Sequence, residues 1–182
     1  MQEIYTRESW YKFHSYNKEN GLNFSHAKNL LLDVKEILDK NNINFILVFG
    51  TLLGAYRENN FIEHDTDIDI GIVGENDIEK IKKILLSGGF LDKGIKLIYG
   101  REFSLCRDNI YIDIYPFIKD GDGYRSKLGW QVNYRLSEED FPFQKINFLG
   151  ENFLTVNEIE KYLIHRYGSD WKQPIKNKHA LR

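Results

Sequence analysis

One short segment limits the possible folds of this chain more than any other. Residues 67–73 read DIDIGIV, so that an aspartate or glycine alternates with an aliphatic residue. Strict alternation is typical of a β-strand with one buried face, because successive side chains point to opposite faces of the sheet. The three isoleucines are therefore predicted to face the core, and Asp67 and Asp69 to lie together on the other face.

Two aspartates on one strand face require a partner. Their Cα atoms would lie about 6.5–7 Å apart, and each charge would raise the pKa of the other unless a cation lies between them. Oxygen ligands of this kind suit Mg²⁺. The alternative is that each aspartate caps a turn or lies on an exposed strand face.

A third aspartate has the same surroundings. Residues 110–117 read IYIDIYPF, which places Asp113 with two tyrosines on one face and the isoleucines on the other. If this strand lies beside strand 67–73, three carboxylates meet at one place. That arrangement suits two-metal phosphoryl or nucleotidyl transfer. The sequence thus predicts Asp67, Asp69 and Asp113 as ligands of Mg²⁺, with two ions expected and Mn²⁺ as a substitute.

A strand-to-helix turn precedes these residues. Residues 48–57, VFGTLLGAYR, pass from a buried strand through Gly50 and Thr51 into a short helix. Gly50 would let a ligand approach the backbone closely, and Thr51 could cap the helix and donate its hydroxyl group. The N–H groups of a first helical turn bind anions, so this turn is predicted to hold phosphate.

The remaining pattern predicts an α/β (α+β) fold, a mixed β-sheet with helices packed on it and a short C-terminal helical segment. The expected helices and strands are a helix from Ser25 to Asn41, a strand over 45–49, a helix over 77–87 capped by Asn76, strands over 95–99, 102–107 and 110–117, a turn at 120–123, irregular strands over 124–156 with a turn near Pro142, and a helix over 157–167 capped by Asn157 and ended by Gly168.

Length and charge exclude several classes of protein. We expect the 182 residues to form one domain, with a core over about 24–120 and a C-terminal extension over about 121–182. The net charge of −2 gives no basic field for nucleic acid. No uncharged run reaches the roughly 18 residues of a membrane span, so we expect no transmembrane segment and a cytoplasmic location. Cys106 is the only cysteine, which excludes an intrachain disulfide and indicates a packed thiol.

Three segments carry a family resemblance. Residues 50–70, GTLLGAYRENNFIEHDTDIDI, resemble the signature of the LicD/fukutin-like branch of the nucleotidyltransferase superfamily, in outline GTLLGAVR, a few residues, then FIPWDDDIDI. Residues 112–117, IDIYPF, resemble the later DIFP element. More loosely, residues 162–163 and YGSDWKQP at 167–174 resemble the closing segment.

The resemblance implies a nucleotidyltransferase-like fold with Asp67, Asp69 and Asp113 as metal ligands, and a role for Gly50 and Thr51 in gripping phosphate. Members generally transfer a phospho-alcohol, such as phosphocholine, glycerol phosphate or ribitol phosphate, from a CDP-linked donor to a sugar hydroxyl of a surface glycan. Two alternatives stay open. One is transfer of a nucleoside monophosphate from an NTP to a small molecule or protein, and the other is a non-catalytic binding module with the same fold.

Several residues near the motif have two interpretations. Arg57 matches the family's arginine and would bind donor phosphate or pair with Asp65. Asp65 itself aligns with the first acid of the family's acidic run and is predicted to orient a metal ligand or water. Asp113 is preferred as the general base, with His64 as the alternative. In this chain His64 replaces the usual Trp, Thr66 replaces an acid, and two asparagines at 59–60 replace a glycine-containing turn.

Overall fold

The computed structural model describes residues 21–74, 78–96, 103–128 and 132–174. The elements in chain order are α2 (Phe24–Lys40), β1 (Phe45–Leu47), α3 (Phe49–Arg57), β2 (Asp67–Val73), α4 (Ile78–Ser87), β3 (Leu91–Lys96), β4 (Phe103–Arg107), β5 (Ile110–Asp120), β6 (Gly123–Leu128), β7 (Val132–Leu136), the 3₁₀ turn η1 (Glu138–Asp140), β8 (Gln144–Phe148), β9 (Glu151–Thr155) and α5 (Ile159–Tyr167). The predicted cap Asn76 and part of the predicted strand 95–99 lie outside the described residues.

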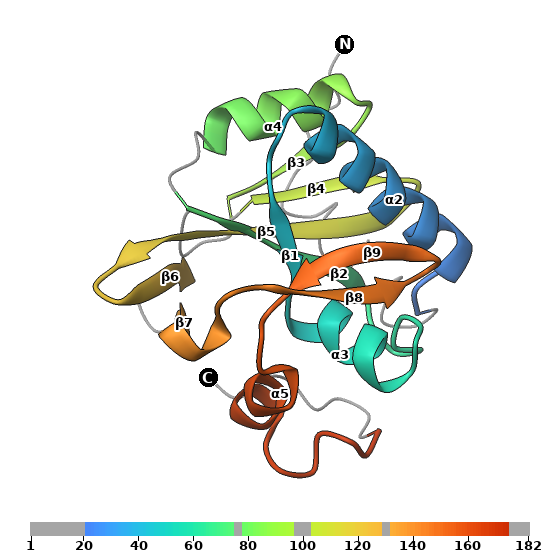
Figure 1. The fold of residues 1–182 in the computed structure, drawn as a ribbon. Coiled ribbons are helices and arrows are strands. Elements are labelled where there is room, and N and C mark those ends of the chain that lie inside the picture. Colours follow the sequence, from blue (N-terminus) through green and yellow to red (C-terminus); the bar gives the residue numbers. More distant parts are fainter. Residues whose placement is uncertain (1–20, 75–77, 97–102, 129–131, 175–182) are drawn as a thin grey trace.

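The described strands form one mixed sheet. Its order is β3-β4-β5-β2-β1-β9-β8, and the β6–β7 hairpin extends it from the far end of the long strand β5 (Figure 1). β2 pairs with β5, and β1 with β9, in the parallel direction, whereas the other pairs are antiparallel. The predicted mixed sheet is confirmed.

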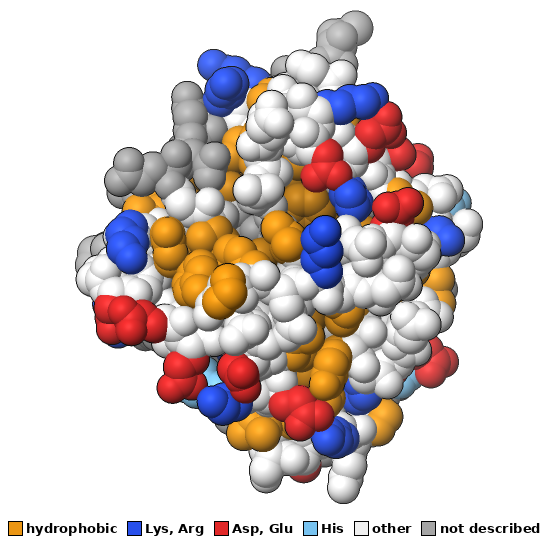
Figure 2. Space-filling model, viewed as in Figure 1, with side chains coloured by type: hydrophobic (Ala, Val, Ile, Leu, Met, Phe, Trp, Pro, Cys, Tyr) orange, Lys and Arg blue, Asp and Glu red, His pale blue; other side chains and the backbone are white. Residues whose placement is uncertain are grey.

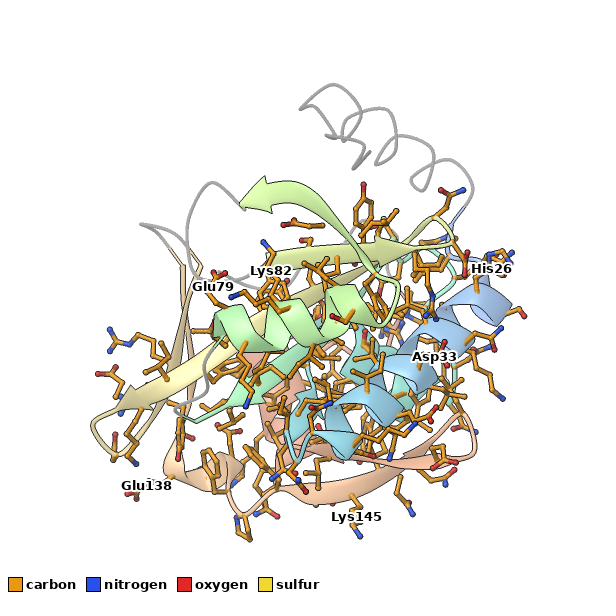
Figure 3. All side chains as sticks on the ribbon, turned by 90° about the horizontal axis from the view of Figure 1, so that it is seen from above. His26, Asp33, Glu79, Lys82, Glu138 and Lys145 are labelled. Atoms are coloured by element: carbon orange, nitrogen blue, oxygen red, sulfur yellow. The ribbon has the colours of Figure 1, made fainter. Side chains whose placement is uncertain are left out.

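The helices lie on both sides of this sheet. α2 and α4 run across the upper side in Figure 1 and lie in front of the sheet in Figure 3, where the labelled side chains of Asp33 on α2 and Lys82 on α4 mark them. α3 and α5 lie together on the lower side. α3 begins two residues after the end of β1, so its first turn lies at the edge of the sheet where β1 ends.

The two strands that carry the predicted metal ligands lie side by side. β2 and β5 are neighbours, and the Cα partner of Asp69 is Asp113. Ile68, Ile70 and Ile72 have no exposed surface, which confirms that they point into the core. The isoleucine face of the β2–β5 pair is thus apolar, and the other face carries the aspartates at its start and the buried Phe117 further along.

Some element boundaries differ from the prediction. The strand expected over 45–49 ends at Leu47, because Phe49 already begins α3 with a φ angle of +45°. The region 124–156 is more regular than expected, since it holds two antiparallel hairpins, β6–β7 and β8–β9, joined through η1 and a cis Phe141–Pro142 peptide bond. The predicted cap Asn157 is wrong. The N-cap of α5 is Glu158, without a side-chain hydrogen bond, while Gly168 ends the helix as predicted.

The surface is mixed in character. Figure 2 shows hydrophobic side chains gathered where β5 continues into β6, with charged side chains of both signs mainly around the rim. Cys106 is buried, as predicted. Among the described helices, none has the length and apolar character needed to cross a bilayer. The cytoplasmic location stays a prediction.

A glycine in β2 gives a test of this packing. A Cβ atom added to Gly71 would lie 2.8 Å from a ring carbon of Phe117 and 3.1 Å from Ile46 Cγ1. Phe117 is fully buried and has no room to move. We expect Gly71→Ala to lower the free energy of unfolding by about 1–3 kcal/mol, the usual cost of overpacking, as measured by urea denaturation.

The double variant with Phe117→Leu is the control. The smaller leucine makes room for the new methyl group, so the double variant should be more stable than the sum of the two single effects by at least about 0.5 kcal/mol. Strict additivity would contradict a direct clash between positions 71 and 117.

Candidate active site

Four carboxyl groups lie together at the start of β2. Asp67 and Asp69 come from β2, Asp113 from the neighbouring position on β5, and Asp65 from the loop before β2. Asp69 is buried with 7% of its surface exposed, and the other three are partly buried. Their mutual effects on acidity show that they form one cluster.

Asp65 and Asp67 share a hydrogen bond. Burial, followed by the charge of Asp65 and this hydrogen bond, raises the pKa of Asp67 to about 8. Burial also raises the pKa of Asp65 to about 6, against the lowering effect of hydrogen bonds from the Thr66 backbone and from Asp67. Asp65 and Asp67 therefore titrate as a coupled pair whose pKa values are both raised by burial.

Asp69 and Asp113 are shifted in the same direction. Burial, then the charges of Asp67, Asp65 and Asp113, raises the pKa of Asp69 well above its usual value. Burial and the charge of Asp67 raise the pKa of Asp113 to about 7. The charged groups that act on these four carboxyls are other acids, and no Lys or Arg in the described part of the chain appears among them.

The turn into α3 meets this cluster at Asp69. The N–H group of Gly50 donates to Asp69 Oδ2 at 3.1 Å. A Cβ atom at Gly50 would lie 2.5 Å from Asp65 Oδ2 and 3.3 Å from Asp69 Oδ2, so a larger residue at position 50 would displace the Asp65 carboxylate. The groups that lie close to the Gly50 backbone in this structure are carboxylates of the chain, and the approach of a ligand to Gly50 stays a prediction.

Thr51 serves a different purpose from the predicted cap. The N-cap of α3 is Val48, which has no side-chain hydrogen bond. Thr51 lies within the helix, and its Oγ1 accepts a hydrogen bond from the N–H group of Asp69 at 2.8 Å. It thereby ties α3 to β2 beside the predicted ligand. Phosphate binding by Gly50 and Thr51 stays a prediction.

Arg57 does not pair with Asp65. Its guanidinium group forms an ion pair with Glu58, and its Nη1 donates to the Trp171 carbonyl oxygen at 3.0 Å. It therefore links the end of α3 to the C-terminal segment. His64, the alternative base, lies exposed in the loop before Asp65.

Two further residues contact the carboxylates. The Tyr115 hydroxyl donates to Asp69 Oδ1 at 3.1 Å, and the Ser104 hydroxyl donates to Asp113 Oδ1. Sequence reasoning placed Tyr115 on the correct face but did not assign it a partner. Ser104 was missed, because only the β4–β5 register, in which it faces Asp113, reveals it.

The donor set fits a divalent cation. Four clustered carboxyls with raised pKa values are hard oxygen ligands that a cation would neutralise. Their oxygens are engaged by one another and by Gly50, Ser104 and Tyr115, and no three metal-binding side chains among the described residues are arranged as a ready-made ion site. Charge and chemistry fit the predicted ions, and the coordination itself stays a prediction.

Residues 42–155 match the family model described as LicD/FKTN/FKRP, nucleotidyltransferase domain. This chain belongs to that family. The matched range contains the whole carboxylate cluster, the turn into α3 and the β2–β5 pair. The family resemblance that the motifs indicated is confirmed.

Relatives in the LicD/FKTN/FKRP family include proteins of bacteria and animals. An uncharacterized protein of Rickettsia prowazekii is 38% identical over 126 residues, which cover 65% of this chain and 45% of that protein. Human ribitol-5-phosphate transferase FKTN is 29% identical over 163 residues, which cover 82% of this chain and 34% of that protein. The chain therefore matches less than half the length of these relatives.

Solved structures confirm the fold. The solution structure of the antibiotic-resistance factor ANT(2'')-Ia superposes with a TM-score of 0.59 and 15% identity, covering 85% of this chain and 77% of that one. The lincosamide adenylyltransferase LnuA superposes with a TM-score of 0.51 and 15% identity, covering 74% and 82%. At such identities the likeness shows the nucleotidyltransferase-like fold alone.

Thr51 offers a test of how the site is held. Thr51→Val keeps the shape but leaves the buried N–H group of Asp69 without its acceptor, which should lower the free energy of unfolding by about 1–3 kcal/mol. Thr51→Ser keeps the oxygen and should cost clearly less. Urea denaturation of both variants checks this, and equal losses would show that the methyl packing of Thr51 matters rather than its oxygen.

In the absence of divalent cations, the raised pKa values of the carboxyls predict an unusual pH dependence of the free energy of unfolding. The pKa values of about 6, 7 and 8 for Asp65, Asp113 and Asp67 lie above the usual value of 3.8, so between about pH 4 and pH 8 the folded chain binds more protons than the unfolded one. Stability must then fall as the pH rises. In EDTA we expect the free energy of unfolding to drop by roughly 2–4 kcal/mol from pH 5 to pH 8.

The matched variants for this prediction are Asp67→Asn and Asp39→Asn. The first removes one of the repelling charges and should flatten the pH dependence. The second alters an aspartate whose side chain is 54% exposed on α2 and should leave the dependence unchanged. A metal-free protein that gains stability from pH 5 to pH 8 would contradict the buried cluster.

Proposed function

We propose that this chain is a Mg²⁺-dependent transferase that moves a phospho-alcohol group from a CDP-linked donor to a sugar hydroxyl of a surface glycan. The carrying observation is the cluster of four carboxyls directly beside the glycine turn that begins α3. Family membership supports the same chemistry, because the related FKTN proteins are named as ribitol-5-phosphate transferases. The transferred group is accordingly ribitol phosphate-like, glycerol phosphate-like or phosphocholine-like.

Asp67, Asp69 and Asp113 are the proposed ligands of divalent cations. They share one face of the β2–β5 pair, and burial and, after it, neighbouring negative charges raise their pKa values. When bound, such cations neutralise and orient the phosphates of a donor. Asp65, hydrogen-bonded to Asp67, is proposed to fix the orientation of that ligand.

The donor phosphates are proposed to approach along the Gly50 side of the cluster. The first turn of α3 lies there, with the Gly50 N–H group bound to Asp69 in this structure, and the absence of a Cβ atom at Gly50 keeps the helix backbone close to the carboxylates. Any larger residue at position 50 would collide with Asp65.

Asp113 is the proposed general base for the acceptor hydroxyl. In the cation-free chain burial raises its pKa to about 7, so an Asp113 carboxyl that no cation binds would exchange protons near neutral pH. The Ser104 hydroxyl, which donates to its Oδ1, fixes the orientation of the carboxyl group. The acceptor is proposed to be a glycan, in line with the resemblance of the motifs.

The test combines binding with product mass. Thermal unfolding would be measured with Mg²⁺ and, in turn, CDP-choline, CDP-ethanolamine, CDP-glycerol, CDP-ribitol and the four NTPs. A ligand at 100 times its Kd adds about 2.7 kcal/mol, which is roughly 5–11 °C for a domain of this size. We expect one CDP-alcohol to give such a shift, and EDTA and Asp67→Asn each to abolish it.

The other outcomes of this experiment would favour one of the two alternative functions. A shift with an NTP alone, with a product heavier by one nucleoside monophosphate, would replace the proposal by nucleotidyl transfer. No Mg²⁺-dependent shift with any of these ligands would favour a binding module. The Asp39→Asn variant is the matched control, since it removes an aspartate on α2 and should bind like the unaltered chain.

A further inference from the structure

The first residue of α3 has an unfavourable backbone conformation. Phe49 adopts a φ angle of +45°, a region in which a non-glycine residue costs on the order of 1–3 kcal/mol and persists only where its surroundings hold it. The preceding N-cap residue is Val48, whose side chain has no oxygen to accept from the first turn. The N–H groups of this turn therefore need acceptors from elsewhere in the chain.

Two distant side chains supply these acceptors. The Tyr162 hydroxyl, from α5, accepts from the N–H group of Phe49 at 3.3 Å. Asp69 Oδ2, from β2, accepts from the N–H group of Gly50 at 3.1 Å. Burial raises the pKa of Tyr162 to about 12, so its hydroxyl is neutral throughout the working pH range. The two acceptors hold consecutive peptide groups.

The Phe49 ring reaches the same carboxylate by a second route. It packs edge-to-face on Tyr115, with ring centroids 4.8 Å apart and an angle of 77° between the planes. The Tyr115 hydroxyl donates to Asp69 Oδ1 at 3.1 Å. Both oxygens of Asp69 are thus held by groups that touch or follow Phe49.

α5 also holds the Phe49 ring. The guanidinium carbon of Arg166 lies 5.4 Å from the centroid of the Phe49 ring and 5.3 Å from that of Tyr162, within the range of cation–π contact. Arg166 is 4% exposed, and its Nη2 donates to the Arg135 carbonyl oxygen at 3.4 Å. One turn of α5 therefore contacts both the peptide and the ring of Phe49.

We propose that Tyr162, supported by Arg166, is a positioning residue that sets the Asp69 carboxylate for cation binding by fixing the Phe49 peptide. Neither residue touches the carboxylate cluster through a hydrogen bond, and α5 lies outside the range matched by the family model. The inference rests on the proposed function only in assigning a cation to Asp69. It makes α5 a part of the active site rather than a helix that merely packs below the sheet.

The decisive variant is Tyr162→Phe. It removes one buried oxygen and keeps the ring, so the chain should fold. The matched control is Tyr56→Phe, since the Tyr56 hydroxyl also joins α3 to α5, through Glu160 at 3.5 Å, and lies at the other end of α3. Both variants lose one hydroxyl between the same two helices, but only the first loses the acceptor of the Phe49 N–H group.

Two readouts separate positioning from packing. Amide hydrogen exchange of Phe49 and Gly50, measured by NMR without any ligand, should become at least about tenfold faster in Tyr162→Phe, while that of Ile70 in β2 changes less than twofold. Mn²⁺ affinity, measured by calorimetry at a temperature at which every variant is folded, should weaken about 5–20-fold, since outer partners of metal ligands are typically worth 10–100-fold and Tyr162 acts through one peptide. Tyr56→Phe should change neither.

Each contrary result has a separate meaning. Mn²⁺ affinity unchanged in Tyr162→Phe, although the chain binds Mn²⁺, would overturn the positioning role and leave packing alone. Arg166→Lys, which keeps the charge but loses the flat stacking group, gives a second test, and we expect a smaller loss of Mn²⁺ affinity in the same direction. If the unaltered chain does not bind Mn²⁺, the proposed function fails, whereas the exchange rates of Phe49 and Gly50 still decide whether Tyr162 fixes this peptide.

Discussion

The mutual repulsion of four buried carboxyls is the constraint on which the site depends. Burial raises the pKa of all four groups, and Asp65, Asp67 and Asp113 each raise the pKa of at least one other member of the cluster further. A packed domain can hold such a group only if favourable packing elsewhere offsets its cost. The fully buried isoleucines on the opposite face of β2 and β5 supply that packing. One face of these two strands is therefore apolar, while the other carries the aspartates near its start and the buried Phe117 further along.

The alternation of aspartates and isoleucines made β2 and its neighbour predictable from the sequence. In β2 the period of two is strict, and its bounds, its buried face and its neighbour β5 all follow the prediction. The signal is strong because a shift by one residue would expose three isoleucines and bury two aspartates. α2 was predictable for a similar reason, since its buried residues recur at helical spacing from Ala27 to Leu38.

Other features depended on contacts that no local pattern records. The strand over 45–49 was predicted two residues too long, because a run of apolar residues does not show where Phe49 turns into the left-handed region. Thr51 was assigned to a cap, whereas Val48 occupies the cap position and Thr51 binds the Asp69 backbone. Ser104 contacts Asp113 only through the β4–β5 register. Tyr162 reaches Phe49 across 113 residues of chain.

These missed contacts share a physical role. Each one holds a group whose local conformation or charge is unfavourable: Tyr162 holds a strained peptide, Thr51 satisfies a buried N–H group beside a repelling carboxylate, and Ser104 donates to a carboxyl of raised pKa. Local sequence reasoning fails at such places because local preference and native structure disagree there, and this disagreement is typical of functional sites. The residues that resolve it must come from elsewhere in the fold, since a neighbour in sequence would be subject to the same local preference. In this chain they come from α3, β4 and α5, so segments far apart in the sequence together hold the cluster in place.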